Sequence, residues 1–136
     1  MMKRTVLFAD DELHNIEGLI ETVRAEGCDI KTCRDATTAV RLVKQGGIDC
    51  LVIDIMMNPG PDFPHNDPQS AGLAAIAEIL SVLPHQPIVC FSVIGDQKVI
   101  NMLKQKGVLY LRKAETSANK AWRVIESKMT GIYRLG

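Results

Sequence analysis

Cys50-Leu51-Val52-Ile53-Asp54 is the stretch that decides the fold, because four apolar side chains in succession are followed at once by a carboxylate. A strand with one face in water alternates apolar and polar residues, whereas a strand buried on both faces is a continuous apolar run. The stretch therefore predicts an inner strand of a parallel sheet covered by helices on both faces, with Asp54 at its carboxyl end.

Similar short apolar runs lie on both sides of this stretch, at residues 6–9, 30–33, 88–91 and 108–111. Between and after them, apolar residues recur at helical spacing over residues 13–23, 36–43, 73–83, 99–103 and 118–129. Five strand–helix units joined by right-handed crossovers predict an α/β, doubly wound three-layer sandwich with five parallel strands.

The composition limits the classes of function. The chain has 136 residues, which is the size of one domain, and 16 basic residues balance 16 acidic ones. Such a chain has no basic field for nucleic acid or anionic lipid, and no apolar run approaches the roughly 18 residues of a membrane span. The four cysteines form no Cys-x-x-Cys pair. We therefore expect buried thiols in a reducing, cytoplasmic protein with neither nucleic acid nor membrane as partner.

Polar side chains interrupt the pattern where the strands end: Asp10 and Asp11 after the first, Asp54 after the third, Ser92 after the fourth and Lys113 after the fifth. The carboxyl ends of parallel strands share one edge of the sheet, and ligands bind there. Any one of these residues is explained as the first polar residue of a loop. Together they predict a single site with three carboxylates, a hydroxyl and an amine.

The charges in such a site indicate its chemistry. Three carboxylates and one ammonium leave two negative charges in a small volume, which would raise the carboxyl pKa values. A hard divalent cation such as Mg²⁺, which prefers oxygen ligands, relieves this repulsion. A carboxylate can also act as a nucleophile toward a phosphoryl group, whose charge the cation, the amine and the hydroxyl would then stabilise.

In this order and spacing, residues 6–12, 51–57, 88–92 and 110–113 resemble the receiver domain of two-component response regulators, the chemotaxis-receiver fold. The resemblance covers essentially the whole chain. It implies a receiver domain over residues 1–131 with an inserted loop at 58–70, followed by a tail or the start of a linker at 132–136. It also implies a flavodoxin-like (βα)5 sandwich with strand order 2-1-3-4-5.

The resemblance assigns the metal site and the nucleophile. Asp54 is implied to be the phosphoacceptor. Asp10 and Asp11 are implied to hold Mg²⁺, or Mn²⁺, together with Asp54 and the backbone carbonyl of Met56.

The resemblance also assigns the groups around the phosphoryl. Ser92 and Lys113 are implied to bind it. Tyr110 occupies the position of an aromatic switch residue that moves inward when Ser92 is recruited, although an amphipathic residue at a sheet edge explains it as well.

The function that follows is a phosphorylation switch and not an enzyme, apart from self-phosphotransfer and slow autodephosphorylation. A histidine kinase or histidine phosphotransfer protein would donate the phosphoryl group. The surface of the fourth helix, fifth strand and fifth helix would then change for a protein partner or a homodimer.

Other functions remain open. The chain could be an unphosphorylated receiver-like interaction module, or a receiver excised from a larger hybrid kinase or regulator. An aspartyl-phosphate hydrolase is disfavoured because Asp54 is followed by Ile55-Met56 and lacks the second Asp of an Asp-x-Asp motif. A nucleotide or flavin binder is disfavoured because no glycine-rich loop follows a strand.

Three departures from the family pattern concern the site. The inserted loop at 58–70 contains four prolines, and we expect an ordered or semi-ordered lid or partner-contact loop. Ala114 follows Lys113 where the family usually has a proline in a cis peptide, so we expect a trans bond or a different loop here. Val93 stands where a very small residue is usual, and we expect it to narrow access to Asp54.

Overall fold

The computed structural model describes residues 3–64, 67–93 and 95–131. The strands of this part are β1 (Thr5–Ala9), β2 (Asp29–Cys33), β3 (Cys50–Ile53), β4 (Ile88–Ser92) and β5 (Leu109–Arg112). The helices are α1 (Glu17–Ala25), α2 (Ala36–Lys44), α3 (Ala71–Val82), α4 (Gln97–Gln105) and α5 (Ala118–Thr130), with short 3-10 turns η1 (Leu13–Ile16) and η2 (Lys113–Glu115).

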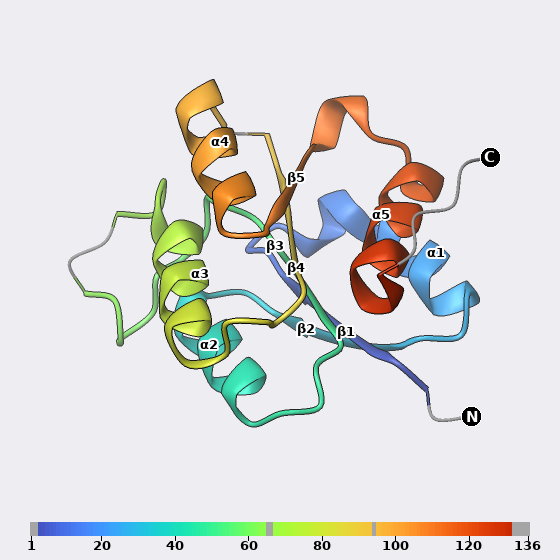
Figure 1. Ribbon diagram of the computed structural model, residues 1–136, viewed down its shortest axis with the longest axis horizontal. Helices are drawn as coiled ribbons and strands as arrows, with labels where there is room; N and C mark the ends of the chain where they lie inside the picture. The colour runs from blue at the N-terminus through green and yellow to red at the C-terminus, as the bar shows by residue number, and fades with distance from the viewer. Residues whose placement is uncertain (1–2, 65–66, 94, 132–136) are drawn as a thin grey trace.

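The five strands are parallel and lie in the order β2-β1-β3-β4-β5. Helices α1 and α5 cover one face of the sheet, and α2, α3 and α4 cover the other (Figure 1). The predicted three-layer, flavodoxin-like sandwich is therefore confirmed, including its strand order.

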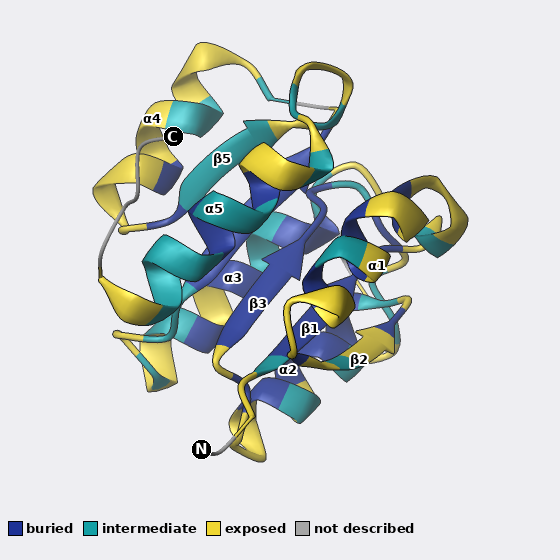
Figure 2. Cartoon of the chain, turned by 90° about the vertical axis from the view of Figure 1, so that its right-hand side faces the viewer, coloured by how far each residue is buried: buried dark blue, intermediate teal, exposed yellow. Residues whose placement is uncertain are grey.

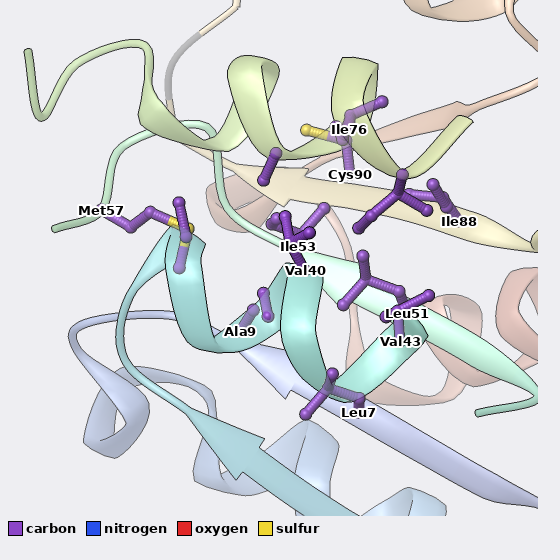
Figure 3. Close-up of a cluster of buried hydrophobic side chains, with 14 of the residues drawn as sticks. Leu7, Ala9, Val40, Val43, Leu51, Ile53, Met57, Ile76, Ile88 and Cys90 are labelled. Atoms are coloured by element: carbon purple, nitrogen blue, oxygen red, sulfur yellow. The ribbon is translucent and has the colours of Figure 1, made fainter. Parts of the chain in front are cut away.

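The central strand β3 is buried along its whole length (Figure 2). Its side chains alternate between two cores, as successive residues of a strand must. Leu51 and Ile53 belong to the core under α2 and α3 (Figure 3), whereas Cys50 and Val52 belong to the core under α1 and α5. Burial on both faces explains why the sequence of this strand is a continuous apolar run.

The start of β5 differs from the sequence prediction. The strand expected at residues 108–111 begins at Leu109, because Val108 is used to close α4. The Val108 N–H donates to the Leu103 carbonyl at 2.9 Å, and the Gly107 N–H donates to the Lys104 carbonyl at 3.0 Å. Gly107 has a φ of 80°, the left-handed conformation that this type of helix end requires.

None of the helices in the described residues is long and apolar enough to cross a membrane.

The four cysteines are free and buried, as the sequence predicts. Burial raises the pKa of the Cys33 and Cys50 thiols to about 12, and it raises the pKa of Cys28 and Cys90 above the ordinary value. Because the thiolate is the reactive form, iodoacetamide at pH 8 should leave the native protein unmodified for a period that labels all four thiols in guanidinium. Mass spectrometry counts the modified residues, and fast native labelling of Cys33, Cys50 or Cys90 would contradict the buried positions.

Candidate functional site

Two buried carboxylates lie side by side at the carboxyl edge of the sheet. Asp10 follows β1 and Asp54 follows β3, and their side chains are almost fully buried. The backbone bonding of the sheet extends through both residues, since the Asp10 N–H donates to the Cys33 carbonyl and the Asp54 N–H to the Ala9 carbonyl, each at 3.1 Å. The hydrogen bonds of the sheet therefore fix the backbone positions of Asp10 and Asp54, from which the two carboxylates extend.

Lys113 joins these carboxylates. Its Nζ donates to Asp10 Oδ2 at 2.6 Å and to Asp54 Oδ2 at 2.8 Å, and its side chain is 14% exposed. Burial acts to lower the pKa of Lys113. The two hydrogen bonds and the charges of Asp10 and Asp54 outweigh burial, so the pKa lies above its usual value. The ammonium thus stays charged and provides the counter-charge for both acids.

The remaining carboxylate oxygens also accept hydrogen bonds. The hydroxyl of the fully buried Ser92 donates to Asp54 Oδ1, and the Met56 N–H donates to the same oxygen at 3.2 Å. The Glu12 N–H donates to Asp10 Oδ1 at 2.9 Å. Each of the four oxygens of Asp10 and Asp54 therefore has a donor, which is what burial of a carboxylate requires.

A cavity of about 400 Å³ opens onto this cluster. It is lined by Asp11, Glu12, Asn15, Asp54, Met56, Val93, Lys113 and Ala114. Asp11 is exposed at this cavity. Partial burial raises the pKa of Asp11, and the charges of Asp10, Glu12 and Asp54 raise it further.

The residues of this cavity fit a magnesium ion by their chemistry. Among the described residues, no group of three or more His, Cys, Asp or Glu side chains is arranged so that it could hold a metal by itself. A Mg²⁺ site needs fewer protein ligands than this, because the ion usually keeps several waters and is bound by one or two carboxylates. Asp11, Asp54 and Met56 line the same cavity, and a cation there would relieve the repulsion that Asp10, Glu12 and Asp54 exert on the Asp11 carboxylate.

Comparison with known families decides the class of the protein. The family described as response regulator receiver domain matches residues 6–121. The chain belongs to this family. Comparison with curated proteins gives no match. Membership makes the chain a signalling module of two-component systems and not a classical enzyme.

Solved structures of receiver domains share the fold. A receiver domain protein from Clostridium thermocellum is 24% identical, with a TM-score of 0.74 over 94% of this chain and 95% of the other. A CheY-like receiver domain protein from Methanospirillum hungatei JF-1 is 12% identical, with a TM-score of 0.78 over 96% of each chain. A response regulator from Burkholderia pseudomallei, described with a phosphorylated aspartic acid, a calcium ion and citrate, is 14% identical, with a TM-score of 0.72 over 95% of this chain and 70% of the other.

The receiver domain brings together the site residues named from the sequence. Asp10, Asp54, Ser92 and Lys113 form one hydrogen-bonded cluster, and Asp11 and Met56 line the cavity beside it. Tyr110 is half-buried on β5, where its hydroxyl donates to the Ser92 carbonyl at 3.4 Å.

Two residues of the cavity were not predicted from the sequence. Glu12 and Asn15 line it. Glu12 directly follows the acidic pair, which is a signal that could have placed it here. Asn15 reaches the cavity only because the chain turns through η1, and the sequence carries no comparable signal for that. Val93 lines the cavity together with Asp54, at the position where its side chain was expected to narrow access to Asp54. The bond between Lys113 and Ala114 is trans, as expected.

The inserted loop at 58–70 is attached to α2. The Ala36 N–H donates to the Asn58 carbonyl at 2.9 Å, and the Thr37 N–H donates to the Pro59 carbonyl at 3.1 Å. The Thr37 hydroxyl donates to the same Pro59 carbonyl and accepts from the Asp62 N–H at 2.9 Å. No described residue of the loop is among those that line the Asp54 cavity. The described part of the loop therefore packs against α2 and does not form a lid over Asp54.

Asp11→Asn should stabilise the metal-free receiver domain. A carboxyl whose pKa is raised by folding is less favourable when charged in the folded state than in the unfolded state, so its charge lowers stability at neutral pH. Thermal unfolding in EDTA should give a higher Tm for the variant at pH 7. The difference in Tm between the variant and the unaltered protein should shrink as the pH falls through the Asp11 pKa, because the Asp11 carboxyl becomes protonated there. The exposed Asp62 supplies the control, since Asp62→Asn should leave the Tm unchanged. A lower Tm for Asp11→Asn would contradict the repulsion.

Proposed function

We propose that this receiver domain is a phosphorylation-dependent signalling switch in which Asp54 accepts a phosphoryl group from a histidine kinase or a histidine phosphotransfer protein. The observation that carries the proposal is the Asp54 carboxylate itself: it is buried, it accepts from both Lys113 and Ser92, and it borders an open cavity. The Burkholderia pseudomallei relative, described with a phosphorylated aspartic acid, supports the same chemistry here. The four free thiols agree with a cytoplasmic location.

The proposed reaction needs little movement of the protein. An Asp54 oxygen forms a bond to phosphorus while the nitrogen–phosphorus bond of the donor histidine breaks, and the released imidazole takes up a proton. Lys113 and Ser92 already contact the Asp54 carboxylate, so they lie close enough to donate to the phosphoryl oxygens. Stabilising charge at pre-positioned groups is the main source of catalysis in phosphoryl transfer.

Mg²⁺, or Mn²⁺, would neutralise negative charge on the phosphoryl group when bound. Asp10, Asp11, Asp54 and the Met56 carbonyl are the groups that would hold it, and Asp11, Asp54 and Met56 line the cavity. Lys113 would keep Asp10 and Asp54 from repelling each other while the metal is absent.

The proposed output surface is formed by α4, β5 and α5. Ser92 provides the link, because its hydroxyl contacts Asp54 and its carbonyl accepts from Tyr110 on β5. A shift of Ser92 toward a phosphoryl group would alter the Tyr110 contact and so the surface around it. A protein partner or a second copy of the chain would read that change.

Acetyl phosphate with Mg²⁺ tests the proposal. Mass spectrometry should find one phosphoryl group on the peptide that contains Asp54. EDTA or the Asp54→Asn substitution should abolish this labelling, whereas Asp62→Asn should be labelled like the unaltered protein. Equal labelling of Asp54→Asn would refute the assignment of the acceptor. A folded protein that takes up no phosphoryl group would favour the unphosphorylated interaction module instead.

A further inference from the structure

The cavity beside Asp54 contains a polar pair that the proposed reaction does not use, Glu12 and Asn15. Both residues are exposed, and both line the cavity. Asn15 Nδ2 donates to Glu12 Oε2 at 2.5 Å, and the Asn15 N–H donates to the Glu12 carbonyl at 2.9 Å. The Glu12 N–H donates in turn to Asp10 Oδ1 at 2.9 Å. Glu12 is therefore held by the buried Asp10 through its backbone and by Asn15 through its side chain.

The Glu12 carboxylate has capacity for a ligand. A carboxylate can accept about four hydrogen bonds, and Asn15 provides one of them at Oε2. The charge of Glu12 acts inside the cavity, because it contributes to the raised pKa of Asp11, another lining residue. Lys113 also lines the cavity, but its Nζ is bonded to the two buried carboxylates. A ligand group that carries an N–H and a positive charge therefore suits Glu12.

Apolar side chains complete the lining. Val93 and Ala114 line the same cavity as Glu12, and Val93 is 62% exposed. Covering an exposed valine with an apolar group is favourable, because apolar surface is removed from water. A small flat ring with an N–H at its edge would contact these side chains with its faces and Glu12 with its edge. Protonated imidazole has this combination of groups.

The reaction would place such a ring at the open end of the cavity. In an in-line transfer the leaving nitrogen lies on the side of phosphorus opposite the attacking Asp54 oxygen. Asp54 is buried, so that side faces the opening. We propose that Glu12, positioned by Asn15, binds the imidazole of the phosphodonor histidine by accepting a hydrogen bond from its far ring nitrogen. The identity of the donor rests on the proposed function, whereas the affinity of the cavity for an imidazolium ring does not.

The contact would also distinguish between phosphodonors. With Glu12 as acceptor, the proton that the imidazole needs is already on its far nitrogen, and the carboxylate stabilises the resulting charge. The Asp54 oxygen bonds to phosphorus as the nitrogen–phosphorus bond breaks. The electron pair of that bond stays on the nitrogen, so the ring leaves as neutral imidazole. Acetyl phosphate is an anion without an N–H, and the Glu12 charge repels it.

Binding of the ring is tested first, on the unphosphorylated protein with Mg²⁺. Imidazolium chloride should cause saturable shifts in the NMR amide signals of Glu12 and Asn15, and Glu12→Ala should abolish the shift at Asn15. The 1,3-dimethylimidazolium ion has the same charge and no N–H, and it should bind severalfold more weakly. Equal affinity for the two ions would overturn the hydrogen bond. The absence of a saturable shift would overturn the site.

The second measurement compares the rates at which N-phosphoimidazole and acetyl phosphate modify Asp54 at saturating Mg²⁺. Glu12→Gln should slow modification by N-phosphoimidazole about tenfold, the effect of losing one charge-assisted hydrogen bond, and should speed modification by acetyl phosphate. Asn15→Ala should change both rates in the same directions by smaller factors. Glu17→Gln is the control, because Glu17 is an exposed acid of α1 that does not line the cavity.

The ratio of the two rates identifies the role of Glu12. Both donors react with the same folded, metal-loaded protein, so a loss of stability or of metal would change both rates by the same factor. An equal change with both donors would therefore overturn the proposal, and so would rates equal to those of Glu17→Gln. If neither donor modifies the unaltered protein, the proposed function fails, and the imidazolium titration still decides whether Glu12 binds the ring.

Discussion

Replacing Lys113 by methionine is expected to lower the free energy of unfolding of the metal-free protein by about 3–5 kcal/mol, the usual cost of removing one partner of a buried ion pair. Methionine keeps much of the length of the side chain and removes the charge. Asp10 and Asp54, both buried, would then face each other without the ammonium that joins them at 2.6 and 2.8 Å. Urea unfolding in EDTA at pH 7 measures the loss.

Two further variants make this expectation specific. Lys44→Met removes the same side chain from an exposed pair with Glu78, at 2.9 Å, and should cost less than about 1 kcal/mol. Adding Asp10→Asn to Lys113→Met removes one of the two buried charges and should restore part of the stability. Equal losses for Lys113→Met and Lys44→Met would mean that Lys113 does not compensate the buried acids.

The strands could be predicted from the sequence because burial determines which residue types a strand contains. A strand such as β3, covered on both faces, has no position for a polar residue, so its apolar run and its end at Asp54 are visible together. The parallel arrangement then brings Asp10, Ser92 and Lys113 to the same edge without further information. Most of the site therefore follows from the ends of the strands.

The rest depends on contacts between segments that are distant in sequence. The inserted loop is held by Thr37, whose hydroxyl bonds to Pro59 and Asp62, more than 20 positions away. A threonine near the start of a helix gives no sign of such a partner. The start of β5 depends on which residues close α4, and Asn15 enters the cavity through a short 3-10 turn. The spacing of apolar residues in the sequence gives no information about these local contacts.

Gly72 lies where two segments that are distant in sequence, α3 and the end of β3, approach each other closely. Gly72→Ala should therefore be strongly destabilising. Gly72 lies in the first turn of α3, and its N–H donates to the Ile55 carbonyl at 2.8 Å. A Cβ here would lie 2.0 Å from the Asp54 carbonyl oxygen and 2.7 Å from the Ile55 Cα. Both are backbone atoms, so the helix or the end of β3 has to move. We expect a loss of about 3 kcal/mol, the upper end of the usual cost of overpacking.

Gly18→Ala is the matched control. Gly18 lies in α1, and a Cβ there meets no atom within 4 Å. Alanine favours a helix over glycine by about 0.5–1 kcal/mol, so this variant should gain stability. Urea unfolding should therefore separate the two substitutions by about 4 kcal/mol, with opposite signs relative to the unaltered protein. Because the displaced atoms in Gly72→Ala belong to Asp54 and the residue after it, phosphoryl uptake at Asp54 should fall as well. A stable Gly72→Ala variant with normal uptake would show that α3 does not hold the Asp54 backbone in place.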